Sequence, residues 1–157
     1  MASVKIFSTR FGEITVEDDR IIEFVGPILG FEQYSRFVIL DHSEDSPFKW
    51  LQSVDEADLA FVITNPKFFG IDYEFALPNE TAEILELTNA DDALVVTLVN
   101  IPPNNPGLMT ANLLGPLVVN QKNRKALQAI LSDSKFNTKT RLIPDELLQK
   151  QSTPVME

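Results

Sequence analysis

The 157-residue sequence contains no cysteine and a single histidine. Without cysteine it cannot form a disulfide or a thiolate metal site. A domain of this length needs neither, because folding buries about two-thirds of the surface of the unfolded chain. A lack of cysteine is also typical of proteins in a reducing cytoplasm, so we expect a cytoplasmic protein.

Basic residues are scarce as well: 13 Lys and Arg stand against 23 Asp and Glu, a net charge of −10. Because neutralising phosphates requires a Lys/Arg surface, this balance argues against nucleic-acid binding through overall charge and favours a basic protein as partner. Residues 1–120 carry 6 basic and 19 acidic side chains, net −13, whereas residues 121–157 carry 7 and 4, net +3. The basic end is either a solvated tail or a segment that contacts a partner.

Long apolar runs are also absent. The longest one in the hydrophobic middle, residues 93–99, is far shorter than the roughly 20 residues of a membrane-spanning helix. Residues 1–10 alternate apolar and polar side chains, which predicts a first strand and not a signal peptide. We therefore expect neither a membrane span nor an export signal.

What the sequence does contain is period-two alternation, the pattern of half-buried strands. Gly12 permits a turn between two such segments, which predicts a hairpin. Residues 125–131 suit a helix by propensity, but Leu127, Ala129 and Leu131 alternate, so we favour a strand. The predicted strands are 5–11, 13–17, 21–24, 36–40, 48–54, 59–64, 93–101, 109–114, 117–120 and 125–131.

One helix is predicted, over 80–87, with Asn79 as its N-cap and acidic residues in its first turn. The fold class is therefore mainly β, an antiparallel meander with one short helix. Residues 1–142 form one domain, and 143–157 form a polar C-terminal tail that is either frayed or a short helix at 144–151. Apolar size and alternation predict a core that includes Phe37, Ile39, Trp50, Phe61, Ile63, Val96 and Leu98.

Catalytic signals are weak. The single His42 lies in a polar, turn-like segment and is interpreted as a surface residue, and no nucleophile elbow or phosphate-binding glycine loop occurs. Acidic clusters such as 55–58 lack the spacing of a calcium loop, so solvated turns explain them better than metal ligands. We expect no cofactor and no enzymatic activity. A small acidic metal-dependent enzyme is the alternative.

Aromatic residues concentrate in one irregular connection, 65–78, which holds four of the fourteen in the chain. Phe68, Phe69 and Tyr73 of this connection either plug the end of a barrel or anchor another protein, and the sequence favours neither.

Seven segments follow one another in a distinctive order: 9–14, 30–32, 36–40, 45–54, 60–66, 72–75 and 110–120. Taken together in this order, they resemble the family of the flagellar assembly factor FliW. The resemblance runs from about Lys5 to Leu142 and departs locally in residues 24–31, where a proline has moved, and at Gly115, where alanine is common.

This resemblance implies a small antiparallel β-barrel-like domain and a non-enzymatic regulator. Such proteins bind the RNA-binding translational repressor CsrA and relieve its block on flagellin translation. They also bind flagellin, which competes with CsrA for them. A chaperone that binds flagellin without CsrA is a further alternative. We predict one partner-binding surface with the aromatics as anchors and Asn112 as an orienting hydrogen-bonding group, formed by Phe68, Phe69, Tyr73, Thr110, Ala111 and Asn112.

Overall fold

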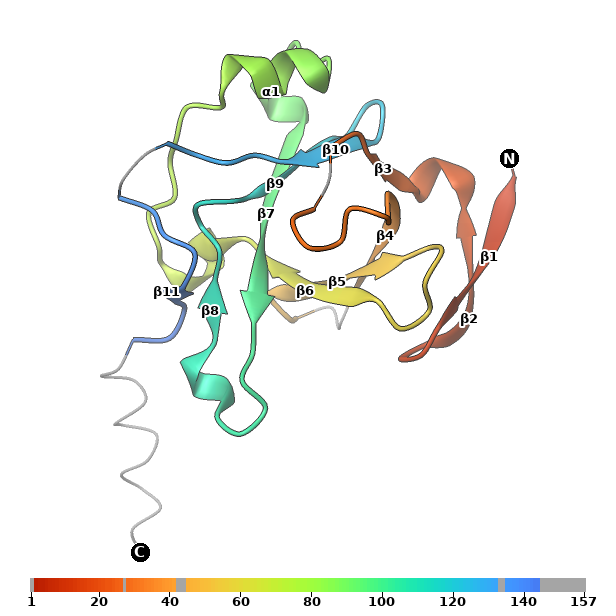
Figure 1. Ribbon diagram of the computed structural model, residues 1–157, viewed down its shortest axis with the longest axis horizontal. Helices are drawn as coiled ribbons and strands as arrows, with labels where there is room; N and C mark the ends of the chain where they lie inside the picture. The colour runs from red at the N-terminus through yellow and green to blue at the C-terminus, as the bar shows by residue number, and fades with distance from the viewer. Residues whose placement is uncertain (1, 27, 42–44, 133–134, 145–157) are drawn as a thin grey trace, which may run out of the picture.

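The computed structural model describes residues 2–26, 28–41, 45–132 and 135–144. This part of the chain is mainly β with one short helix, as predicted (Figure 1). His42, and the predicted tail from residue 145 on, lie outside the described residues. The elements are β1 Ser3–Ser8, β2 Gly12–Glu17, β3 Ile22–Phe24, β4 Arg36–Asp41, β5 Phe48–Ser53, β6 Ala60–Thr64, α1 Asn79–Ile84, β7 Ala93–Asn100, β8 Thr110–Ala111, β9 Leu117–Asn120, β10 Lys125–Gln128 and β11 Thr140–Arg141.

Seven strands close into a barrel in the order β3, β4, β5, β6, β7, β9, β10. Strands β3 to β7 form the antiparallel meander read from the sequence, and β10 returns to pair with β3. The predicted antiparallel β-barrel-like domain is confirmed, and the β10–β3 pair is the one parallel pair in this ring of seven strands. The reason is geometric, because strand directions that alternate around a ring of seven cannot all be antiparallel.

Alternation along the strands sends one set of side chains into the barrel. Phe37, Ile63 and Val96 are buried there as predicted, and Ile39, Phe61 and Leu98 are half-buried and pack against the same core. Trp50 is the exception. Its neighbour Leu51 is the inward-facing residue of β5, so the Trp50 ring lies on the outside, under the Arg10 guanidinium at 4.3 Å.

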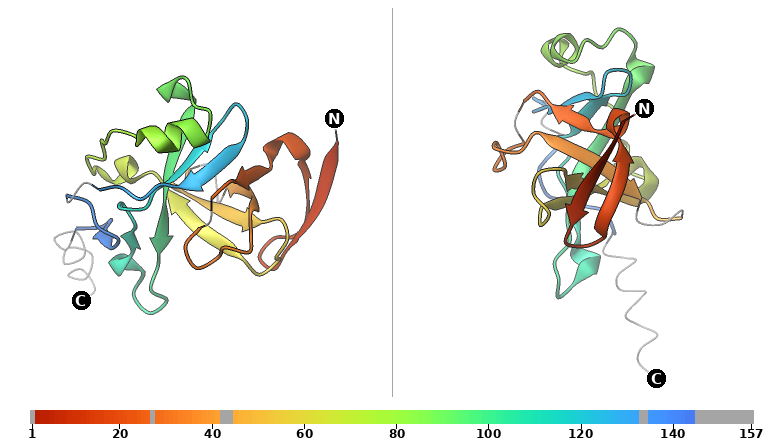
Figure 2. Two further views of the ribbon diagram at one scale, coloured as in Figure 1. Left: turned by 45° about the horizontal axis from the view of Figure 1, so that its top comes forward. Right: turned by 90° about the vertical axis from the view of Figure 1, so that its right-hand side faces the viewer.

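Strands β1 and β2 form a separate two-stranded ribbon beside the barrel (Figures 1 and 2). The predicted hairpin is confirmed, with Gly12 at a φ of 75° starting the second strand. Besides the contact of Arg10 with Trp50, hydrogen bonds attach the ribbon to the barrel: the Ser8 hydroxyl donates to Gln52 Oε1 at 2.8 Å, and the Thr9 amide donates to the Ala57 carbonyl at 2.9 Å. These bonds hold the ribbon against β5 and the β5–β6 turn.

The helix α1 is shorter than predicted. It begins at Asn79, so Pro78 and not Asn79 occupies the N-cap position, and no side chain caps it. It stops because Glu86 adopts a positive φ of 58°, which ends helical geometry. Since Asn79 adopts helical backbone angles, its side chain does not play the capping role that the sequence suggested.

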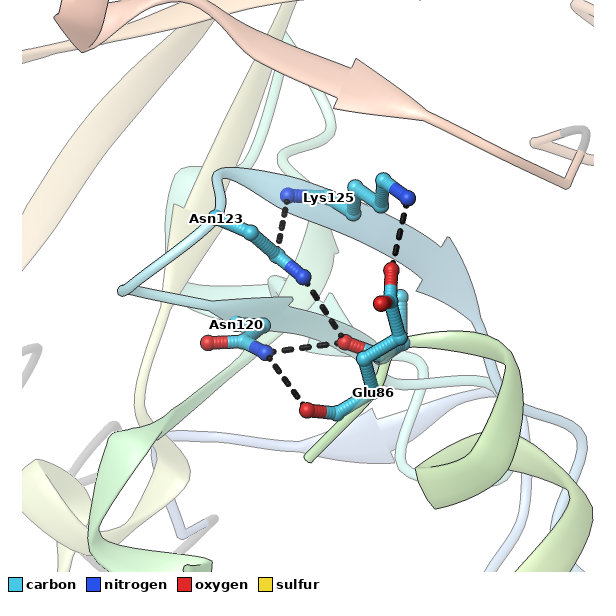
Figure 3. A network of polar contacts seen from close by, with 5 residues as sticks. Glu86, Asn120, Asn123 and Lys125 are labelled. Atoms are coloured by element: carbon cyan, nitrogen blue, oxygen red, sulfur yellow. Dashed lines mark hydrogen bonds and ion pairs between the residues drawn. The ribbon is translucent and has the colours of Figure 1, made fainter. Parts of the chain in front are cut away.

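A polar network fastens the end of α1 to the hairpin between β9 and β10 (Figure 3). Asn120 Nδ2 donates to the Leu85 carbonyl at 2.8 Å, and Asn123 Nδ2 donates to the same oxygen at 3.1 Å. Lys125 Nζ lies 2.7 Å from a Glu86 carboxylate oxygen, and this hydrogen bond lowers the pKa of Glu86. The network gives the freed helix-end carbonyl its donors.

Predicted strand 125–131 is confirmed as β10 over its first four residues. Predicted strand 109–114 is reduced to the two residues of β8, because the chain turns at Asn112. The register is well defined there: Ala111 pairs with Val99 of β7 on one side and with Thr140 of β11 on the other. Strands β8 and β11 therefore extend the sheet beyond β7, and the segment 110–112 there holds half of the residues of the predicted binding surface.

Candidate protein-binding surfaces

Phe68 lies on a short 3₁₀ helix, Pro66–Phe69, that follows β6. Asn65 Oδ1 accepts a hydrogen bond from the Lys67 amide at 3.0 Å, and Gly70 ends the turn at a φ of 77°. The Phe68 side chain is 68% exposed. The short helix is therefore fixed at its start by Asn65 and Pro66 and at its end by Gly70. It holds the Phe68 ring in solvent, where an aromatic side chain can anchor a partner.

Tyr73 and Phe69 behave differently from Phe68. Tyr73 is only 4% exposed, and its hydroxyl donates to the Leu113 carbonyl at 2.6 Å. Phe69 is half-buried, with its ring centroid 5.6 Å from that of Phe48. The expectation that Tyr73 is an exposed anchor is wrong for this structure, because its ring fills the core beneath β8 with Phe136 at 5.0 Å.

The second predicted stretch is also largely structural. Ala111 is fully buried, so its side chain cannot touch a partner, and that part of the prediction is wrong. Asn112 Oδ1 accepts a hydrogen bond from the Gly115 amide at 2.9 Å, which makes Asn112 a satisfied turn residue. Thr110 is half-exposed on β8. Of the two open interpretations, core and turn roles fit Tyr73, Ala111 and Asn112, while Phe68 keeps the exposure that an anchor needs.

The two stretches border different hollows. Phe68 lines a cavity at one end of the barrel, whereas Thr110 and Asn112 line a cavity of about 230 Å³ beside β7 and β8. Tyr73 connects the stretches beneath the surface, through its bond to the Leu113 carbonyl and through the core cluster that it shares with Ala111 and Phe69. A binding role for Phe68, Thr110 or Asn112 stays a prediction, and the two stretches are better treated as separate surfaces.

Exposed carboxylates lie on several elements of the described chain. The acidic turn Asp55–Asp58 lies between β5 and β6. The Thr9 hydroxyl of the ribbon hydrogen-bonds to Asp58, and Arg36 at the start of β4 lies 2.6 Å from Asp55. Several other carboxylates form no salt bridge with a described residue, so their charge is free to act on an approaching molecule. They are Glu17, Asp18, Asp19, Glu56, Glu80 and Glu83.

Sequence reasoning missed a group of exposed apolar side chains near β10. Val25, Leu29 and Ile130 are 42%, 66% and 58% exposed. The Val25 amide donates to the Ala126 carbonyl at 2.8 Å, and the Leu29 amide donates to the Gln128 side chain at 3.0 Å. For Val25 and Leu29 the signal is the apolar loop after β3, which has no alternating pattern and buries only Ile28 of its three large aliphatic side chains.

Within the described ranges, no three His, Cys, Asp or Glu side chains gather as potential metal ligands. Likewise, in the described part of the chain no helix has the length and hydrophobicity to cross a membrane.

The fold and the surfaces together define a small β-barrel domain with an acidic exterior, a class suited to binding other proteins. The particular family follows from comparison: a family model described as FliW protein matches residues 5–142, and the chain belongs to the FliW family of flagellar assembly factors. This confirms the resemblance seen in the sequence.

Individual relatives agree. The flagellar assembly factor FliW of Treponema denticola is 41% identical over 136 residues, covering 87% of this chain and 91% of the relative. The Bacillus subtilis protein of the same name is 43% identical over 136 residues, covering 85% of this chain and 94% of the relative. A crystal structure of the flagellar assembly factor FliW matches with a TM-score of 0.82 at 34% identity, covering 91% and 99% of the two chains. The barrel is therefore the family fold.

Proposed function

We propose that this chain is a cytoplasmic, non-enzymatic regulator that binds the translational repressor CsrA and flagellin, and thereby relieves repression of flagellin translation. Membership of the FliW family supports a role in flagellar assembly. The observation that carries the finer proposal is the acidic exterior, since a repressor that binds RNA presents a basic surface. A carboxylate-rich partner attracts such a surface and repels RNA from it.

The electrostatic part of this proposal has a measurable size. Residues 1–120 carry a net charge of −13, and the unpaired carboxylates lie on the ribbon, on the β5–β6 turn and on α1. Raising the salt from about 50 to 500 mM shortens the Debye length from roughly 14 to 4 Å. Association with CsrA should therefore slow strongly with salt, and a salt-independent association rate would remove charge steering from the mechanism.

The test of partnership is a titration of the purified chain against purified CsrA bound to a flagellin leader RNA. We expect RNA release as the chain is added, and recovery of RNA binding when flagellin is added to the mixture. Binding to flagellin without any effect on CsrA would instead establish the flagellin-binding chaperone. A large rise in thermal stability with divalent metal would favour the metal-dependent enzyme.

Phe68 is the proposed aromatic anchor, and the chain offers a matched control. Phe7 on the ribbon is 62% exposed, close to the 68% of Phe68, and neither ring is part of the core. We expect Phe68→Ala to weaken binding of CsrA or flagellin by more than tenfold while Phe7→Ala leaves it within twofold. Both variants should keep the wild-type stability to within about 0.5 kcal/mol. Equal binding by both variants would remove Phe68 from the interface.

Thr110 and Asn112 require a different design because Asn112 is part of a turn. Thr110→Ala removes a half-exposed hydroxyl, and Asn112→Asp keeps an oxygen that can accept from the Gly115 amide while adding a charge. Weaker partner binding by these variants at unchanged stability supports a contact at β8. Unchanged binding assigns both residues to the fold alone.

A further inference from the structure

The open end of the barrel holds a cavity of about 430 Å³. It lies where β3, β5, β7 and β10 begin and where β4 and β6 end. Five aliphatic side chains form its wall: Ile22, Ile39, Ile63, Leu94 and Val96. The volume is within the range of about 300–1,000 Å³ that is typical of small-molecule sites.

The cavity exists because the barrel core is filled unevenly. The large rings of Phe24, Phe37 and Phe61 lie together, with the Phe24 and Phe37 centroids 5.4 Å apart. Toward the other end the inward positions hold branched aliphatic residues, which leave space between the strands. A barrel of about eight strands is just wide enough to be filled by side chains or to hold one small ligand.

Charge at the mouth is opposite to that of the molecule. Arg20, Lys49 and Arg124 line the cavity, and no Asp or Glu among the described residues does, although acidic residues outnumber basic ones by 23 to 13 in the chain. Lys49 is paired with Asp41, and the charge of Arg20 acts on the same carboxylate, while neither Arg20 nor Arg124 forms a salt bridge with a described residue. Arg124 also borders a neighbouring cavity, which Asp18, Asp19 and Glu23 share with it.

We propose that the barrel mouth binds an aliphatic monocarboxylate, of the medium-chain fatty acid class. The carboxylate lies between Arg20 and Arg124, and the alkyl chain enters along Ile39, Ile63 and Leu94. Phe68 stands on the rim of the same cavity and covers the chain where it enters. The two halves of the ligand match two parts of the cavity: the aliphatic side chains of the wall contact the alkyl chain, and Arg20 and Arg124 at the mouth pair with the carboxylate.

The experiment is a calorimetric titration of the purified chain with butanoate, hexanoate and octanoate. We expect one site and an affinity that rises about fourfold for each added methylene group, the effect of burying it. Octan-1-ol, which lacks the charge, and octylammonium, which reverses it, should both bind more weakly than octanoate. Equal binding of all three chain lengths, or of octylammonium and octanoate, would overturn the proposal.

Variants locate the site. Replacing both Arg20 and Arg124 by Gln should weaken octanoate about fivefold or more, while the matched Lys122→Gln in the same hairpin, outside the cavity lining, should leave it unchanged. Leu94→Phe fills the half-buried wall and should abolish binding, with thermal unfolding confirming that it folds. Octanoate binding that survives both changes means surface adsorption only and refutes the site. If the arginine variant loses CsrA or flagellin and the wild type binds no octanoate, the mouth is a protein surface and the ligand assignment is wrong.

Discussion

The buried hydroxyl of Tyr73 provides the sharpest test of the distinction between core and interface. Tyr73→Phe removes one oxygen and leaves the ring, which packs 5.0 Å from Phe75 and from Phe136. The hydrogen bond that is lost is the one donated to the Leu113 carbonyl at 2.6 Å. An anchor residue would lose binding in this variant, whereas a core residue loses stability.

The size of the effect follows from burial. A buried carbonyl that loses its donor costs about 1–3 kcal/mol. For a domain of about 150 residues, 1 kcal/mol corresponds to roughly 2–4 °C in melting temperature, so Tyr73→Phe should melt about 2–12 °C lower. Urea unfolding followed by the fluorescence of Trp50 measures the same loss as a lower midpoint with an unchanged slope.

The matched control is Tyr34→Phe, which changes the only other tyrosine. Tyr34 is half-buried against the barrel core, and its hydroxyl has no hydrogen bond to another described residue, so we expect a change below about 0.5 kcal/mol. A Tyr73→Phe protein as stable as the Tyr34→Phe protein would refute the assignment of Tyr73 to the core. Binding of CsrA and flagellin by the folded Tyr73→Phe protein should match the wild type.

Three further predictions use the same unfolding assay. Burial raises the pKa of Tyr73 well above its ordinary value, so as pH rises above about 10 the Tyr73 hydroxyl ionises in the unfolded chain before it does in the folded one. The free energy of unfolding therefore falls by up to about 1.4 kcal/mol per pH unit, and Tyr73→Phe should lose this part of the alkaline slope. Phe37→Ala, at a fully buried site, should cost about 3–5 kcal/mol, and Phe61→Ala, at a half-buried site, clearly less; equal costs would contradict the burial assignment. Asn120→Ala removes a buried donor to the end of α1 and should cost about 1–3 kcal/mol, whereas Asn123→Ala, at an exposed site, should cost about 0.5 kcal/mol or less. A larger cost for Asn123→Ala than for Asn120→Ala would contradict the role of Asn120 in holding the helix end.

Most strands could be predicted from the sequence because alternation is a local property of each segment. The phase of an alternation is not local, since it depends on which side of the sheet becomes the interior. Trp50 shows the difference: its size suggested a core residue, yet Leu51 occupies the inward position and Trp50 packs under Arg10. The parallel pairing of β10 with β3 could not be predicted either, because these strands are about 100 residues apart in the sequence and pair only when the barrel closes.

The candidate surfaces were harder to predict for the same reason. Phe68 and Tyr73 are five residues apart in one loop, and nothing in their immediate sequence separates the exposed ring from the buried one. The cations of the barrel mouth are scattered over residues 20–124 and become neighbours only in the closed fold. Aromatic density indicated the right loop but could not assign the role of each ring.

Gln52 links the barrel to the acidic surface in a way that a reading of local sequence does not reveal. Its amide is fully buried; Nε2 donates to the Ser53 and Leu59 carbonyls at 3.2 and 3.1 Å, and Oε1 accepts from the Ser8 hydroxyl. One side chain therefore holds the carboxylate-bearing turn 55–58 and the ribbon at the same time. A turn held in place before a partner arrives loses little conformational entropy on binding, so this buried amide supports the basic partner that we propose by preorganising the acidic turn.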